Sequence, residues 1–134
     1  MINMTQEEKQ LLLRDLCARL PYGVKFECNK NIYTAKGLDL IVTDEGDWEY
    51  AVTAKGIAPI EIDFIKPYLY PLSSMNEEQK EIYCKLQQKV IYNSKGVVTE
   101  DVMNYVNWCY ENHLDINNLI PNDLAIDVTG KNIY

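Results

Sequence analysis

Residues 24–62 constrain the fold most strongly, because short runs of alternating apolar and polar residues are separated there by turn residues. Trp48, Tyr50 and Val52 show the alternation clearly. Successive side chains of a strand point to opposite faces, so this pattern predicts a small antiparallel sheet with one buried face. We therefore expect Trp48 to lie in the core together with Tyr50 and Val52.

The middle of this stretch predicts a bend and a tight turn. One alternating segment starts at Ile32 and continues past Gly37, where a β-bulge would let the chain bend. An acidic turn at 44–47 then reverses the chain. Strands this short favour a sheet that curls into a small barrel, and residues 22–70 are similar in this respect to SH3-like (Tudor-type) barrels.

Helices are predicted on both sides of the sheet. Thr5 and Glu8 form a capping box before a run of leucines at helical spacing. After the sheet, either Asn76 with Gln79 or Ser74 with Glu77 caps a second helix. Gly96 closes the connection to a third helix, which Thr99 caps. The segment 124–128 alternates, which leaves a strand and an extended arm both open.

These elements predict an α+β fold. It consists of an N-terminal helix, a small curled antiparallel (SH3-like) sheet, and then two or three C-terminal helices packed on that sheet. Residues 1–72 form the helix plus sheet and residues 73–134 the helical part. A chain of 134 residues is long enough to bury its own core, and we expect one compact unit.

The chain is acidic, and the acids are concentrated. Thirteen Lys and Arg against twenty Asp and Glu give a formal net charge of -7, which disfavours direct binding of nucleic acid. Between Asp39 and Asp63, acidic residues greatly outnumber the single Lys55. Two interpretations stay open: Asp44, Glu45, Asp47 and Glu49 bind a basic partner, or they only keep the protein soluble.

The N-terminal residues lack a basic region followed by an apolar run, and no apolar stretch is long enough to span a membrane. We therefore expect a cytoplasmic protein without membrane contact. The four cysteines are dispersed, with no C-x-x-C pair and no second histidine to complete a zinc site. We expect reduced thiols that serve as small, partly buried apolar residues, and no cofactor.

His113, the single histidine, follows the third helix, where a positive charge would stabilise the free carbonyl groups. This capping or packing role is the favoured interpretation. Cys109 lies one helical turn earlier, so a Cys109–His113 catalytic dyad is the alternative, although Cys109 also completes the apolar stripe of the helix. Asp44, Glu45 and Asp47 fit a hairpin turn better than a metal site.

Ten tyrosines are unusual for this length. Tyr33, Tyr68 and Tyr70 are the hardest to bury together, and an SH3-like sheet often uses exposed aromatic side chains to bind a ligand. An aromatic binding surface near Tyr68 is therefore one expectation. The other, which we favour, is that these rings pack between the sheet and the C-terminal helices.

Three segments resemble a family of small proteins from gut anaerobes and their phages or prophages. The segments are LCARLPYGV at 16–24, IKPYLYPLSSM at 65–75, and the region around Trp108, His113, Leu119 and Ile120. Together they extend over most of the chain. The resemblance implies a phage or mobile-element setting and no particular reaction.

The sequence therefore favours a non-enzymatic accessory protein that binds another protein. One version is an acidic inhibitor that imitates nucleic acid and occupies the basic cleft of a host protein. Two alternatives remain open: a small hydrolase that uses Cys109 and His113, and a structural homo-oligomer built through the tyrosine-rich surface.

Overall fold

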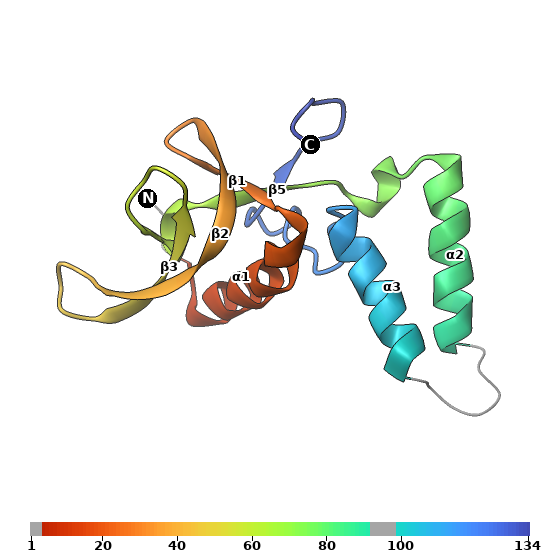
Figure 1. The fold of residues 1–134 in the computed structure, drawn as a ribbon, viewed down its shortest axis with the longest axis horizontal. Coiled ribbons are helices and arrows are strands. Elements are labelled where there is room, and N and C mark those ends of the chain that lie inside the picture. Colours follow the sequence, from red (N-terminus) through yellow and green to blue (C-terminus); the bar gives the residue numbers. More distant parts are fainter. Residues whose placement is uncertain (1–3, 92–98) are drawn as a thin grey trace.

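The computed structural model describes residues 4–91 and 99–134 (Figure 1). The three α-helices of this part are α1 (Gln6–Arg19), α2 (Glu77–Ile91) and α3 (Thr99–Glu111), with short 3-10 turns η1 (Leu20–Tyr22), η2 (Ile62–Phe64) and η3 (Leu72–Ser74). Its strands are β1 (Lys25–Cys28), β2 (Asn31–Val42), β3 (Trp48–Ala54), β4 (Ile60–Glu61), β5 (Lys66–Leu69) and β6 (Ile126–Asp127). None of these helices has the length and apolar character needed to cross a lipid bilayer.

The strands form one open, mixed sheet in the order β4-β3-β2-β1-β5-β6. Pairing is antiparallel from β4 to β5, whereas β6 runs parallel to β5, with Tyr68 opposite Ile126. The α+β class is confirmed, but the closed antiparallel barrel is wrong. Between β5 and β6 the chain passes through α2 and α3. This long connection lets β6 pair with β5 in the parallel direction.

A β-bulge interrupts β2 where the sequence predicts it. The register with β3 shifts between Ala35 and Gly37, and a Cβ on Gly37 would come within 3.2 Å of Thr53 Oγ1. Because of the extra residue, the side chains of Ala35 and Leu38 point to the same face. Both therefore contribute to the main core. The face that carries Leu38 is therefore the core face of the sheet.

The main core lies between α1 and the sheet. Leu12 and Leu16 of α1 are fully buried against Phe26 and Val52. The capping box at the start of α1 is confirmed, because the Glu8 N–H donates to Thr5 Oγ1 at 3.1 Å and the Thr5 N–H donates to Glu8 Oε1 at 3.0 Å.

The helices α2 and α3 do not both pack on the sheet. In the described residues α2 buries no side chain completely and lies beside α3, at the end of the molecule away from the sheet (Figure 1). Tyr83 and Tyr105 join the two helices through a hydrogen bond of 2.9 Å between their hydroxyl groups. Asn76 and Gln79 cap α2 reciprocally, as one of the two alternatives predicts. Gly96 and the Thr99 side chain lie outside the described residues.

A buried ion pair connects α1 to the segment that follows α3. Arg19 Nε donates to Asp15 Oδ2 at 2.7 Å, and both side chains are fully buried. Arg19 Nη2 also donates to the carbonyl of Leu114 at 2.6 Å, while Asn117 Nδ2 donates to Asp15 Oδ1 at 2.9 Å. The Tyr110 ring lies 4.8 Å from the guanidinium carbon. This network makes the expected parts 1–72 and 73–134 one packed unit.

Replacing Arg19 with Ala is expected to lower the free energy of unfolding by about 3 to 5 kcal/mol, because the Asp15 carboxylate would stay buried without its partner. Arg14→Ala, on the exposed side of the same helix, is the matched control and should change it by less than about 0.5 kcal/mol. Urea unfolding followed by circular dichroism measures both values. Equal effects of the two substitutions would contradict the role of the ion pair.

The double variant Asp15→Leu/Arg19→Met tests the same point if Arg19→Ala does not fold. It removes both charges and fills a similar volume with apolar atoms, so it should be more stable than Arg19→Ala. A double variant no more stable than the single variant would show that packing, rather than the unpaired charge, causes the loss.

Candidate functional site

The β2–β3 hairpin extends beyond the rest of the sheet. β1 pairs with β2 only over residues 31–34, and β4 pairs with β3 only at Ala51 and Val52. Residues 39–50, which we call the hairpin arm, therefore form a two-stranded ribbon without a third strand on either side. Figure 1 shows the arm projecting past α1.

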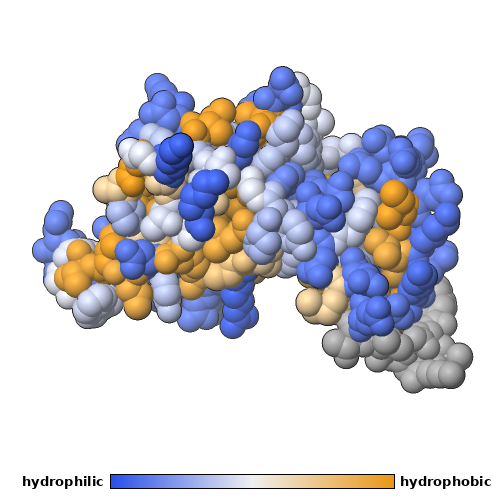
Figure 2. All heavy atoms as spheres, viewed as in Figure 1, coloured by the Kyte–Doolittle hydropathy of each residue, from blue (hydrophilic) through white to orange (hydrophobic). Residues whose placement is uncertain are grey.

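Four apolar side chains lie exposed along one face of the arm: Leu40, Val42, Trp48 and Tyr50. Leu40 is opposite Tyr50 and Val42 is opposite Trp48, so these four, which we call the apolar strip, share one face. Trp48 is 71% exposed, and the other three are between 43% and 55% exposed. Figure 2 shows apolar side chains running along the arm toward its tip.

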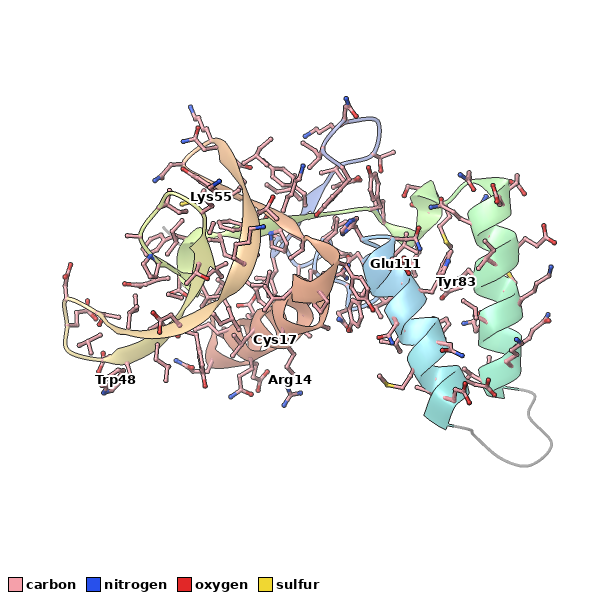
Figure 3. All side chains as sticks on the ribbon, viewed as in Figure 1. Arg14, Cys17, Trp48, Lys55, Tyr83 and Glu111 are labelled. Atoms are coloured by element: carbon pink, nitrogen blue, oxygen red, sulfur yellow. The ribbon has the colours of Figure 1, made fainter. Side chains whose placement is uncertain are left out.

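The expectation that Trp48 and Tyr50 are buried is wrong. The predicted alternation itself is correct, because Val52 lies on the same face and is fully buried. The core ends at Val52, beyond which α1 no longer covers the sheet. Figure 3 shows Trp48 projecting from the arm on the side where α1 carries Arg14 and Cys17. The apolar strip is thus a continuation of the core face without a covering layer.

The acidic residues of the arm lie at its tip and on the face opposite the apolar strip. Asp44, Glu45 and Asp47 are exposed at the tip, where the Thr43 N–H donates to the Asp47 carbonyl at 2.8 Å and closes the turn. Glu49 differs from them, because Lys9 Nζ donates to its Oε2 at 2.9 Å. Residues 39–50 contain five Asp and Glu and no Lys or Arg. The arm therefore combines an apolar face with one sign of charge.

The tyrosines expected to form a binding surface are not together on the surface. Tyr68 is 7% exposed, so an exposed patch centred on Tyr68 is wrong. Tyr33 is partly buried in the main core beside Phe26, with 5.7 Å between the ring centroids. Tyr70 belongs to the second core, which packs against α3. Packing against a C-terminal helix accounts for Tyr70, whereas Tyr33 packs in the main core.

His113 ends α3 through its backbone. Its φ of 57° is left-handed, the His113 N–H donates to the Tyr110 carbonyl, and the Leu114 N–H donates to the Cys109 carbonyl. This is the Schellman arrangement for a helix end. The imidazole stacks on the Tyr134 ring, with the centroids 3.6 Å apart. The ring of His113 therefore packs, as one of the two expected roles has it, and the helix end is capped by backbone groups.

The charge expected on His113 is wrong, and the dyad lacks the chemistry of a nucleophile. Burial, aided by Arg19, lowers the pKa of His113 to about 4, so the ring is neutral near pH 7. Burial raises the pKa of the Cys109 thiol to about 11, and its side chain is fully enclosed. A nucleophilic cysteine needs a lowered pKa and access to substrate, and Cys109 has neither.

One hollow in the described part has a volume of about 790 Å³ and lies near η2 and β6. Three of its charged groups already form ion pairs: Lys66 with Asp123 at 2.7 Å, and Asp63 with Lys9 at 3.3 Å. Burial raises the pKa of Cys28 at its wall. Within residues 4–91 and 99–134, no three His, Cys, Asp or Glu side chains are placed to hold a metal ion.

The cysteines divide into two pairs. Cys28 and Cys109 are buried free thiols, as expected of small apolar residues. Cys17 and Cys84 are exposed free thiols, so the expectation of partial burial is wrong for them. They lie on the outer sides of α1 and α2, which face solvent.

Comparison with known proteins adds no relative. The chain matches no protein-family model, and no curated protein and no solved structure is significantly similar to it. The candidate site therefore depends on geometry, and the hairpin arm is the strongest candidate. Leu40 and Val42 were missed from the sequence, although their alternation up to the acidic turn was visible.

Trp48→Ala and Phe26→Ala form a matched pair that tests the limit of the core. Phe26 is fully buried, so its loss should lower the free energy of unfolding by about 3 to 5 kcal/mol. Trp48 is on the same face but exposed, and its loss should cost less than about 0.5 kcal/mol. Urea unfolding of both variants provides the comparison. A large loss in Trp48→Ala would show that the strip is covered within the chain.

The pKa of His113 predicts an acid-sensitive fold. Because the folded protein holds this pKa at about 4, below the ordinary 6.5, the unfolded chain binds the proton first as the pH falls. Stability should therefore decrease between pH 6.5 and pH 4. NMR titration of the single imidazole measures the pKa, and His113→Asn, which tolerates the left-handed backbone, should show a weaker decrease. A ring that titrates near 6.5 would contradict the burial.

Proposed function

We propose that this protein binds another protein through the hairpin arm. The observation that carries the proposal is the apolar strip, a stretch of core-type sheet face that α1 leaves uncovered. Exposed apolar surface of this kind on a small domain is typical of interaction sites. Trp48 and Tyr50 are residue types that often dominate binding energy when a partner buries them.

The acidic residues of the arm indicate the partner's charge. Asp44, Glu45 and Asp47 are exposed at the tip of the arm and would attract a partner with basic residues beside an apolar surface. An inhibitor that inserts the acidic tip into a basic cleft is one form of this function. The resemblance to phage-associated proteins favours a host protein as the partner in that form.

The two alternative functions have less support. A homo-oligomer built through the tyrosine-rich surface would need those rings exposed together, whereas Tyr68 is 7% exposed and Tyr33 and Tyr70 pack in two different cores. A Cys109–His113 hydrolase would need an accessible thiolate, whereas the Cys109 side chain is enclosed and its pKa is about 11.

Affinity measurements with arm variants test the proposed function. Proteins from lysate of the source cells that the wild type retains would be identified, purified and titrated by calorimetry at low and high salt. Trp48→Ser should weaken binding by about tenfold or more. The triple variant Asp44→Asn/Glu45→Gln/Asp47→Asn should slow association and flatten its salt dependence.

Ile32→Ser is the matched control, because Ile32 is 51% exposed on the same strand but outside the arm. It should leave the affinity unchanged. Equal binding of the wild type, Trp48→Ser and the triple variant at both salt concentrations would contradict the proposal, as would the absence of any protein whose retention depends on Trp48.

A further inference from the structure

Two outward N–H groups of the hairpin arm, one on each edge, are bound by carboxylates of the arm itself. The Leu40 N–H donates to Asp39 Oδ1 at 2.8 Å, and the Tyr50 N–H donates to Glu49 Oε1 at 3.2 Å. Leu40 and Tyr50 are direct cross-strand partners that do not bond to each other, so their N–H groups point to opposite outer edges of the ribbon. A partner strand would have to displace a carboxylate and leave its charge at the interface.

The apolar face is a surface that a partner can cover without displacing a carboxylate, and α1 shows what kind of element fits it. Leu12 and Leu16 of this helix pack in the main core with Val52, on the face that continues outward as Tyr50 and Trp48. Figure 3 shows Trp48 on the α1 side of the arm. A second helix beside α1 would extend the existing helix-on-sheet layer over the apolar strip.

The same helix shows how positive charge meets the arm. Lys9 of α1 donates to Glu49 at 2.9 Å, and this hydrogen bond is the main reason that the pKa of Lys9 is raised. Among the described residues, the other four arm acids form no ion pair: Asp39, Asp44, Glu45 and Asp47. Lys or Arg side chains on a second covering helix would complement the three of these that lie at the tip.

We propose that the apolar strip receives a basic amphipathic α-helix of a partner protein, laid beside α1, with its Lys or Arg side chains toward Asp44, Glu45 and Asp47 at the tip of the arm. The inference rests on the proposed function and adds the form and charge of the binding element. It differs from strand addition, in which backbone hydrogen bonds of the partner would provide the affinity.

Selection from two display libraries of equal diversity tests the inference on the full chain. One library presents a single randomised helix on a helical scaffold, and the other presents randomised extended strands. Binders are selected on the wild type and counter-selected on Trp48→Ser. We expect helical binders rich in Lys and Arg on one flank, which bind Trp48→Ser about tenfold or more weakly and Ile32→Ser normally. In NMR spectra they should shift the amides of residues 39–50.

The outcomes separate the inference from the proposed function. Arm-dependent binders from the strand library alone would overturn the helix and leave the function standing. Arm-dependent helices without basic residues would overturn the charge assignment. The absence of arm-dependent binders from both libraries would count against the function itself.

The variant Asp39→Ala tests the bound edge amide separately, because it frees the Leu40 N–H. Strand peptides should bind this variant more tightly than the wild type. Equal binding to both would show that Asp39 does not protect the edge.

Discussion

The buried ion pair of Asp15 and Arg19 is the constraint on which the rest of the structure depends. Two charges fully removed from water need hydrogen-bond partners, and here the segment after α3 supplies the Leu114 carbonyl and the Asn117 amide. Among the described residues, Arg19 Nη1 is buried without a partner. α1 and this segment must therefore be in register with each other. α1, held in this way, covers the sheet as far as Val52.

The exposed apolar strip follows from this limited coverage. α1 is long enough to bury Val52 but not Tyr50 or Trp48, and the hairpin continues without it. An uncovered ribbon of this kind is normally at risk of strand-to-strand aggregation. Asp39 and Glu49 reduce that risk because each carboxylate binds one edge amide, and a strand added there would have to displace it.

The sequence predicted the local features well and the long-range ones poorly. The capping box of Thr5 and the bulge at Gly37 depend on neighbouring residues, and both are confirmed. Alternation identified the correct face for Trp48 but not its burial, since alternation carries no information on where the covering helix ends. The charge of His113 was wrong because its pKa depends on burial by distant residues such as Tyr134. Coverage by a helix likewise depends on distant residues. The sequence therefore identified the acids of the arm but not its uncovered face.

The buried ion pair also orders events during synthesis on the ribosome. Asp15 and Arg19 meet within one helical turn as soon as α1 forms, but the groups that complete their burial are 95 and 102 residues further along the chain. Until those residues emerge, the two charges have nowhere to be buried, and β5 has no β6 beside it. The nascent chain must therefore remain incompletely folded until most of it has been translated, and a fragment that ends at β5 would lack a stable native state.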